Sequence, residues 1–120
     1  MPKILVIDDS KVIRSLLTAE LEGRGHQVDT AEDGMQGLAK ATSERFDLVL
    51  IDAMMPGVGG FEVCRKLADT RVEGKPRLVM FSNRTKDFQA RQQASGAGAD
   101  AFVSKQSPAR LADELSQLLD

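Results

Sequence analysis

The stretch that most constrains the fold runs from Leu48 to Gly57 and reads LVLIDAMMPG. Four consecutive large apolar residues closed by a Pro-Gly pair predict a short strand buried on both faces, because a half-exposed strand would alternate apolar and polar residues. Asp52 follows this strand directly, at the sheet edge where open α/β proteins bind ligands. An aspartate in that position alone is more often a turn former. Its role therefore depends on what else reaches the same edge.

Four other runs in the chain also predict strands. Lys3–Ile7 and Arg77–Phe81 are largely continuous apolar runs, which are typical of central strands in a parallel sheet. The alternating run His26–Ala31 and the short run Ala101–Val103 are more typical of edge strands.

A helical pattern follows each predicted strand. Ser10 and the Ser107-Pro108 pair are helix starts, and glycines mark several helix ends. The second helix is predicted over Gly34–Ser43, and the fourth over roughly Thr85–Ser95, where a thin apolar stripe predicts the weakest anchoring. The apolar residues at helical spacing are Ile13, Leu16, Leu17 and Leu21; Met35, Leu38 and Ala39; Phe61, Cys64, Leu67 and Ala68; Phe88, Ala90 and Ala94; and Leu111, Leu115 and Leu118.

Alternation of five strands with five helices predicts an α/β fold. The connections are too long for hairpins, so the sheet should be parallel with right-handed crossovers. The three apolar strands belong in the centre and the other two at the edges, which a strand order of 2-1-3-4-5 satisfies, with helices on both faces in a flavodoxin-like (βα)5 arrangement. With 120 residues and no repeat or linker, we expect one domain spanning residues 1–120.

Composition excludes several classes of function. A net charge of −2 and the lack of basic clusters argue against binding of nucleic acid by this domain. The N-terminus is too acidic for a signal peptide and no apolar run reaches membrane-spanning length, so we expect a soluble, cytoplasmic protein that does not bind membranes. One cysteine, Cys64, and one histidine, His26, form neither a disulfide nor a zinc site, and we expect both to be structural.

The chemistry is predicted at the carboxyl ends of the strands, which all lie at one edge of a parallel sheet. Asp8 and Asp9 follow the first strand and should therefore meet Asp52 at the end of the third. Two ionised carboxylates about 4 Å apart repel each other by about 4 kcal/mol at an effective dielectric near 20, so a cation is expected between them. An oxygen-only cluster with room for water suits Mg²⁺.

A bound Mg²⁺ would also let an anion approach this pocket. Asp52 could then act as a nucleophile toward phosphorus, since carboxylates form aspartyl phosphates in some ATPases. Lys105 would supply a positive charge to the incoming phosphoryl group, and the Ser82 hydroxyl could donate a hydrogen bond to it. Each residue alone has a simpler explanation as a helix-start, turn or solvated loop residue. Their joint occurrence at the ends of several parallel strands favours the chemical interpretation.

Several motifs occur in this chain at specific spacing. They are the acid pair of VIDDS, the LIDAMMPG stretch, the Gly-Gly pair before the third helix, Ser82 after the fourth strand, GAD before the fifth strand, and Lys105 after it. By this set the chain resembles the receiver domain of two-component response regulators, over essentially its whole length. The resemblance implies a switch that catalyses only its own phosphorylation and dephosphorylation, not an enzyme acting on other substrates.

The resemblance also implies roles for individual residues and partners. Asp52 is similar to the phosphoacceptor, Asp8 and Asp9 to the Mg²⁺-binding acids, and the backbone carbonyl of Met54 to a further metal ligand. Ser82 and Lys105 resemble the pair that senses the phosphoryl group, and Phe102 occupies the place of the aromatic switch residue. The implied partners are a histidine kinase or phosphotransfer protein, and a target protein or effector domain. We expect the target to dock on the fourth helix, fifth strand and fifth helix, because the fourth helix is thinly anchored and lies beside Ser82 and Phe102.

Several departures from the family pattern affect the switch more than the chemistry, and one of them is the segment from Ser82 to Lys105, which is one residue longer than is typical. Gln106 stands where proline usually follows the lysine, Phe102 lacks the hydroxyl of the commoner tyrosine, and Asn83 replaces a small residue. A pseudo-receiver that binds proteins without phosphorylation therefore remains an alternative, although the full set of five polar residues counts against it.

Two other classes are disfavoured by the residues themselves. A phosphohydrolase of the haloacid dehalogenase type would place a second aspartate two residues after the nucleophile, where this chain has Met54. A flavodoxin-like FMN binder would have a first loop rich in hydroxyls and glycine, whereas this loop carries Asp8 and Asp9.

Overall fold

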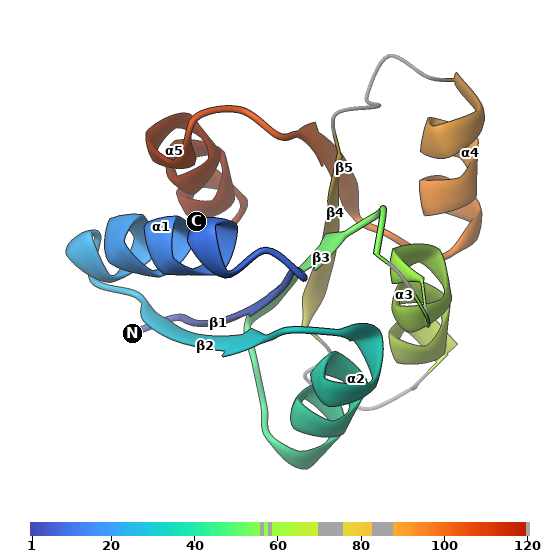
Figure 1. The fold of residues 1–120 in the computed structure, drawn as a ribbon, viewed down its shortest axis with the longest axis horizontal. Coiled ribbons are helices and arrows are strands. Elements are labelled where there is room, and N and C mark those ends of the chain that lie inside the picture. Colours follow the sequence, from blue (N-terminus) through green and yellow to red (C-terminus); the bar gives the residue numbers. More distant parts are fainter. Residues whose placement is uncertain (56, 58, 70–75, 83–87, 120) are drawn as a thin grey trace.

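A computed structural model of the chain describes residues 1–55, 57, 59–69, 76–82 and 88–119. Five strands alternate with five helices along the chain (Figure 1). The strands are β1 (Lys3–Ile7), β2 (Gln27–Ala31), β3 (Leu48–Asp52), β4 (Arg77–Ser82) and β5 (Ala101–Ser104). The helices are α1 (Lys11–Gly23), α2 (Gly34–Ser43), α3 (Gly60–Asp69), α4 (Phe88–Gly96) and α5 (Pro108–Leu119). The predicted α/β class is confirmed.

All five strands are parallel and lie in the order β2-β1-β3-β4-β5, as predicted. The three apolar strands occupy the centre because both of their faces are covered. Leu5 and Ile7 of β1 face one side of the sheet, while Ile4 and Val6 face the other, and all four are fully buried. The edge strands are less buried, since β5 has no fully buried residue.

The helices form two layers around the sheet. α1 and α5 pack together on one face, and α2, α3 and α4 lie in sequence along the other (Figure 1). Leu17 and Leu21 of α1 join Leu111 and Leu115 of α5 in the core under the first layer. Cys64 of α3 is buried under the second layer, which agrees with its expected structural role.

The two helices of the first layer begin at the residues that the sequence indicates. The Ser10 hydroxyl accepts a hydrogen bond from the Ile13 N–H at 3.3 Å, which satisfies one of the free donors at the start of α1. Ser107 does the same for the Arg110 N–H at 3.3 Å, and Pro108 is the first residue of α5. The helices are therefore fixed at the sheet edge where the polar residues gather.

Four apolar residues at helical spacing, Ala39 among them, are exposed and not in the core. Leu16, Met35 and Phe88 expose 46%, 71% and 71% of their surface. In α2 the reason is steric, because the buried residues are Gly34 and Gly37 and a Cβ at Gly37 would lie 2.4 Å from Ile7 Cδ1. The side of α2 that approaches β1 most closely is thus built from glycines.

Only part of the range predicted for the fourth helix, roughly Thr85–Ser95, lies within the described residues. Its buried residues are Ala90 and Ala94, in line with the thin apolar stripe. Residues 83–87, which include the predicted helix start at Thr85 and the departure at Asn83, lie outside the described residues, as does Pro56 of the Pro-Gly pair.

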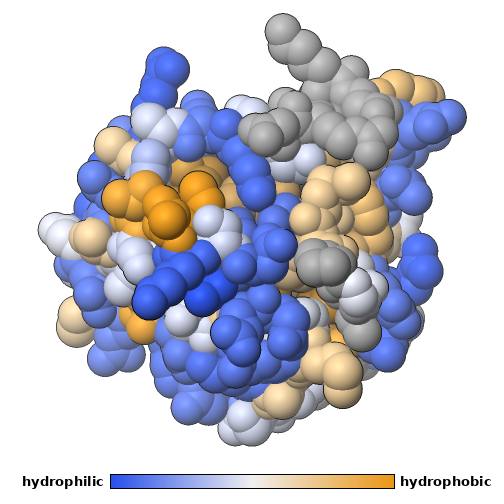
Figure 2. Space-filling model, in the orientation of Figure 1, coloured by the Kyte–Doolittle hydropathy of each residue, from blue (hydrophilic) through white to orange (hydrophobic). Residues whose placement is uncertain are grey.

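The visible surface is mostly hydrophilic. A hydrophobic group lies over α1 and α5 on the face shown in Figure 2. Val12 and Leu16 of α1 are among the exposed large apolar residues. His26, after α1, contacts α5 through Nε2, which lies 2.9 Å from the Ser116 hydroxyl. None of the helices in the described residues combines the length and apolar character that crossing a membrane requires.

Candidate functional site

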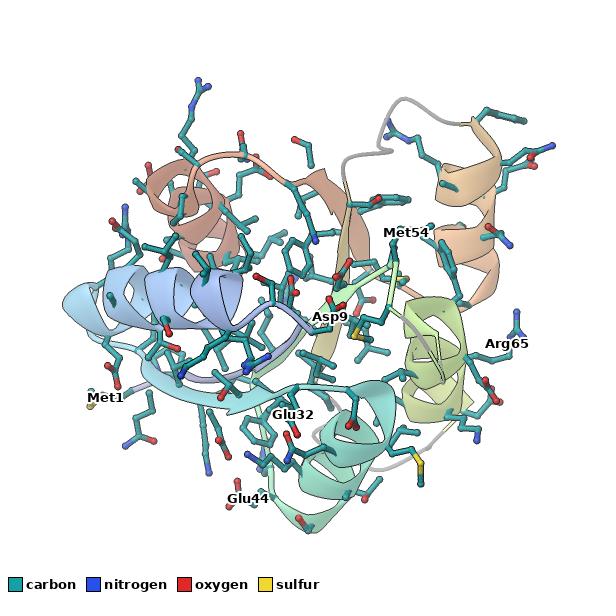
Figure 3. The ribbon with its side chains drawn as sticks, viewed as in Figure 1. Met1, Asp9, Glu32, Glu44, Met54 and Arg65 are labelled. Atoms are coloured by element: carbon teal, nitrogen blue, oxygen red, sulfur yellow. The ribbon has the colours of Figure 1, made fainter. Side chains whose placement is uncertain are left out.

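Three carboxylates meet at the carboxyl edge of the sheet. Asp8 and Asp9 follow β1, and Asp52 is the last residue of the neighbouring strand β3. One carboxylate oxygen from each lies within 4.8 Å of the other two. Asp8 and Asp52 are buried, whereas Asp9 is exposed and lies near the end of β3 with Met54 (Figure 3). The site is therefore an acidic pocket with a buried floor and an open side.

Asp8 is only partly compensated. Its Oδ1 accepts a hydrogen bond from the Ser10 N–H at 2.8 Å, but within the described part of the chain its buried Oδ2 has no hydrogen-bond partner. Burial raises the pKa of Asp8 above its usual value, and the negative charges of Asp52 and Asp9 add to this, against the lowering effects of the Ser10 N–H and Lys105. The pocket thus penalises the ionised form of Asp8.

Asp52 is held by backbone contacts around the end of β3. Its Oδ1 accepts a hydrogen bond from the Met54 N–H at 3.0 Å, and the following residue, Ala53, donates its N–H to the Phe81 carbonyl at 3.0 Å. Gly60, at the start of α3, lies against the same strand end, where an added Cβ would be 2.1 Å from the Asp52 carbonyl oxygen. The position of Asp52 therefore depends on a close approach that only glycine allows.

Lys105 supplies the positive charge of the pocket. Its Nζ lies 3.2 Å from Asp52 Oδ2 and 3.5 Å from Asp8 Oδ2. The backbone N–H of Lys105 donates to the Ser82 carbonyl at 3.0 Å, and the ammonium lies 4.9 Å from the centre of the Phe81 ring. One lysine therefore balances two buried acids at once.

Ser82 and Phe102 lie on the side of the sheet covered by α3 and α4. Ser82 ends β4 and is buried, and Phe102 on β5 is paired in register with Met80. Because side chains two residues apart on a strand face the same side, Ser82 and Met80 share a face, and Phe102 packs against the core cluster that contains Met80. A surface hollow of about 280 Å³ between α4 and β5 is lined in part by Phe102.

Three contributors to the site were not predicted from the sequence. They are the Phe81 ring beside Lys105, the Arg14 guanidinium that donates to the Asp8 carbonyl at 2.8 Å, and the close approach of Gly60. Phe81 and Arg14 carry no sequence signal for these contacts, since both depend on how α1 and β4 are placed. The close approach of Gly60 did have a sequence signal, the Gly-Gly pair at the start of α3.

A parallel sheet of this order with three acids and a lysine at its carboxyl edge defines a phosphoacceptor module of the two-component signalling class. The chain belongs to the family of the response regulator receiver domain, whose sequence profile matches residues 4–116. Members of this family are signalling switches rather than enzymes that turn over a separate substrate.

Curated relatives include transcription regulators and a shorter protein. The transcriptional regulatory protein AfsQ1 of Streptomyces coelicolor is 36% identical over 113 residues, which are 94% of this chain and 48% of that protein. Protein PilH of Pseudomonas aeruginosa is 43% identical over 81 residues, 67% of each chain. The chain spans about half the length of the first of these relatives and of similar regulators.

Solved structures share the whole fold. Chemotaxis protein CheY4 of Vibrio cholerae is 31% identical, with a TM-score of 0.89 over 98% of both chains. The response regulator TrrA of Thermotoga maritima, solved in complex with Mg²⁺-BeF, is 32% identical, with a TM-score of 0.83 over 100% of both chains.

Proposed function

We propose that this domain, spanning residues 1–120, accepts a phosphoryl group on Asp52 from a histidine kinase or a phosphotransfer protein, and thereby changes its affinity for a target. The observation that carries the proposal is the placement of Lys105 Nζ within 3.2 Å of Asp52 Oδ2 and 3.5 Å of Asp8 Oδ2 at a strand end. Such an arrangement puts a nucleophilic carboxylate and a phosphate-binding cation side by side.

In the proposed reaction, a carboxylate oxygen of Asp52 forms a bond to the phosphorus of a phosphohistidine. The bond between phosphorus and the imidazole nitrogen breaks, the imidazole retains the electron pair and takes up a proton, and the product is an acyl phosphate on Asp52. Lys105 would offset the negative charge of the transferred group, and the buried Ser82 hydroxyl would donate a hydrogen bond to one of its oxygens.

The donor set fits Mg²⁺. Three carboxylates in reach of one another and a buried Asp8 oxygen with no hydrogen-bond partner among the described residues are suited to a hard cation. We propose Asp8, Asp9, Asp52 and the Met54 carbonyl as its ligands. The relative TrrA was solved in complex with Mg²⁺-BeF, which supports Mg²⁺ as the cation. A bound Mg²⁺ would neutralise part of the pocket's charge and orient phosphoryl oxygens.

For the output, we propose the surface of α4, β5 and α5. Ser82 and Phe102 lie on the sheet face that α4 covers, and α4 buries only Ala90 and Ala94 among its described residues. A weakly anchored helix beside the hydroxyl is suited to a two-state change. The partners would be proteins, with no nucleic acid or membrane bound by this domain, and the site of action would be the cytoplasm, where kinases have access to ATP.

The test is incubation of the chain with acetyl phosphate, with Mg²⁺ or with a chelator, followed by intact-protein mass spectrometry. We expect the wild-type protein to gain one acid-stable, base-labile phosphoryl group only with Mg²⁺, and Asp52→Asn to gain none. No phosphoryl group on the wild type would reject the proposal in favour of a pseudo-receiver. Continued release of phosphate from several phosphoesters, with turnover, would instead support a haloacid dehalogenase-type hydrolase.

The output proposal needs a second measurement. Beryllofluoride and Mg²⁺ should mimic the phosphoryl group and shift backbone resonances of α4, β5 and α5. A response restricted to residues of the acidic pocket would reject this surface as the output.

A further inference from the structure

The connection from β5 to α5 consists of Lys105, Gln106 and Ser107. It is fixed at its first residue, because the Lys105 N–H donates to the Ser82 carbonyl on β4. It is also fixed at its last residue, because Ser107 caps α5 and its carbonyl accepts from the Leu111 N–H at 3.0 Å. The middle residue, Gln106, is the part of the loop with no such backbone anchor in the described contacts.

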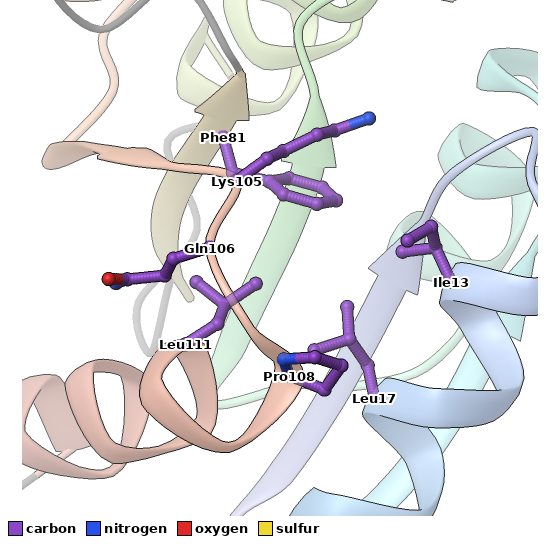
Figure 4. A pocket seen from close by; sticks show the side chains of 7 residues that line it. All are labelled: Ile13, Leu17, Phe81, Lys105, Gln106, Pro108 and Leu111. Atoms are coloured by element: carbon purple, nitrogen blue, oxygen red, sulfur yellow. The ribbon is translucent and has the colours of Figure 1, made fainter.

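Gln106 is anchored by its side chain instead. Its Nε2 donates a hydrogen bond to Glu114 Oε1 on α5, in a half-buried position. The adjacent side chains of Lys105 and Gln106 extend in different directions, Lys105 toward the acids and Gln106 away from them (Figure 4). The ion pairs of Lys105 within the described residues are with Asp8 and Asp52, so Glu114 does not compete for its ammonium.

Apolar packing beneath the loop is incomplete. A small cavity of about 20 Å³ lies between α1 and α5, directly under Lys105 and Gln106 (Figure 4). Its apolar walls come from Ile13, Leu17, Phe81, Pro108 and Leu111. Because a void removes the contacts that would hold the chain from that side, the loop depends more on its polar anchors.

We propose that Gln106 and Glu114 form a clamp that positions Lys105 so that its ammonium reaches Asp8 and Asp52. The clamp restrains the centre of a three-residue loop whose first residue must direct a long, flexible side chain toward two carboxylates. A hydrogen bond to a charged acceptor is among the stronger ones. Its consequence for phosphorylation rests on the proposed function, whereas its effect on the loop does not.

The first test measures the loop directly. Hydrogen exchange of the Lys105 amide, followed by NMR, reports opening of its bond to the Ser82 carbonyl. We expect Glu114→Ala and Gln106→Ala each to speed this exchange about tenfold, the size of one lost charge-assisted hydrogen bond. The Asp8 amide, which bonds to the Ala31 carbonyl on the far side of the pocket, should keep its rate. Gln117→Ala, an exposed glutamine on the same helix, is the matched control.

The second test measures phosphorylation by acetyl phosphate with Mg²⁺. Both alanine variants should slow it about tenfold, while Glu114→Gln, which keeps an acceptor oxygen, should lose less. Gln106→Glu should also be slow because two carboxylates then face each other. Adding Glu114→Gln to Gln106→Glu restores a donor and an acceptor in reversed order and should return the rate to within about twofold of the wild type.

The outcomes separate this inference from the proposed function. Faster Lys105 exchange in the alanine variants of a chain that takes up no phosphoryl group would support the clamp and reject the proposed function. Wild-type exchange and phosphorylation rates in both alanine variants would overturn the clamp. Failure of the reversed pair to restore the rate would also overturn it, since a loss of general packing predicts no rescue.

Discussion

Lys105 Nζ lies 3.2 Å from Asp52 Oδ2, and the same ammonium reaches Asp8 Oδ2 at 3.5 Å. Both carboxylates are buried, while the lysine side chain is 24% exposed. In the metal-free chain, a partly solvated cation therefore compensates two desolvated anions. This sharing makes the stability of the domain sensitive to any change at the pocket.

Lys105→Met keeps the length and apolar stem of the side chain but removes its charge. We expect the free energy of unfolding of the metal-free protein to fall by about 1 kcal/mol at pH 7, because solvent already screens part of the interaction. The same substitution should slow phosphorylation by a much larger factor than it changes the equilibrium constant for unfolding. Urea unfolding followed by circular dichroism measures the first effect, and Lys11→Met, on the exposed start of α1, is the control. Equal losses in the two variants would show that the pocket charges are not coupled.

Asp8→Asn should stabilise the metal-free protein by roughly 1 kcal/mol at pH 7. The neutral amide can still accept from the Ser10 N–H, and the repulsion from Asp52 and Asp9 disappears. The measurement is urea unfolding in a chelator, with Asp47→Asn at an exposed position for comparison. A loss of stability would show that the contacts of Asp8 with Lys105 and the Ser10 N–H outweigh its burial and its repulsion by the other two acids.

The gain from Asp8→Asn should depend on pH. Burial and the neighbouring charges raise the folded pKa of Asp8 above 3.8, so the folded chain holds this proton more tightly than the unfolded chain. The resulting stabilisation of the wild type is complete below pH 3.8 and is lost as pH rises through the folded pKa. The difference between variant and wild type should therefore be small in acid and grow toward neutral pH. A gain that is constant across this range would contradict the pKa direction.

The sequence predicted the fold so well because its strongest signals are local. Lys3–Ile7 and Gly34–Ser43 have the predicted bounds, since apolar runs, caps and glycines mark them directly. Strand order followed from which runs were apolar on both faces. The convergence of Asp8 and Asp52 then followed from topology alone, because parallel strands end at one edge.

Hydropathy did not predict which residues of α2 are buried, because the short distance between this helix and the sheet decides which side chains fit there. Met35 has the more apolar side chain, yet Gly37 faces the sheet because Ile7 leaves no room for a Cβ there. The Gln106–Glu114 hydrogen bond could not be predicted from the sequence either, since two polar residues eight positions apart form no recognisable sequence motif. Such features need the packed structure.

Gly60→Ala should be strongly destabilising, because its Cβ would lie 2.1 Å from the Asp52 carbonyl oxygen. We expect a loss of about 1–3 kcal/mol, as for overpacking, together with a weaker response to Mg²⁺ as Asp52 shifts. The neighbouring Gly59→Ala is a close control, since an added Cβ there meets nothing within 4 Å. Thermal unfolding of both variants decides the matter, and similar melting temperatures would argue against the close approach.

Asp9→Asn should separate metal binding from folding. Asp9 is exposed, so the metal-free stability should change by less than about 0.5 kcal/mol. In the wild type, Mg²⁺ at 100-fold above its Kd should add about 2.7 kcal/mol, and the variant should lose most of this gain. The measurement is the free energy of unfolding of both proteins, with Mg²⁺ and with a chelator. An unchanged Mg²⁺ effect would remove Asp9 from the proposed ligands.

The brevity of the β5–α5 connection has a mechanical consequence. Three residues between Ser104 and Pro108 leave little slack, so a displacement of Lys105 would be passed to the start of α5. A helix of 12 residues is about 18 Å long, and turning it by about 5° about its first turn moves its far end by about 1.6 Å. A small movement at the pocket would then give a larger displacement of the surface beyond Ser116, at the far end of α5.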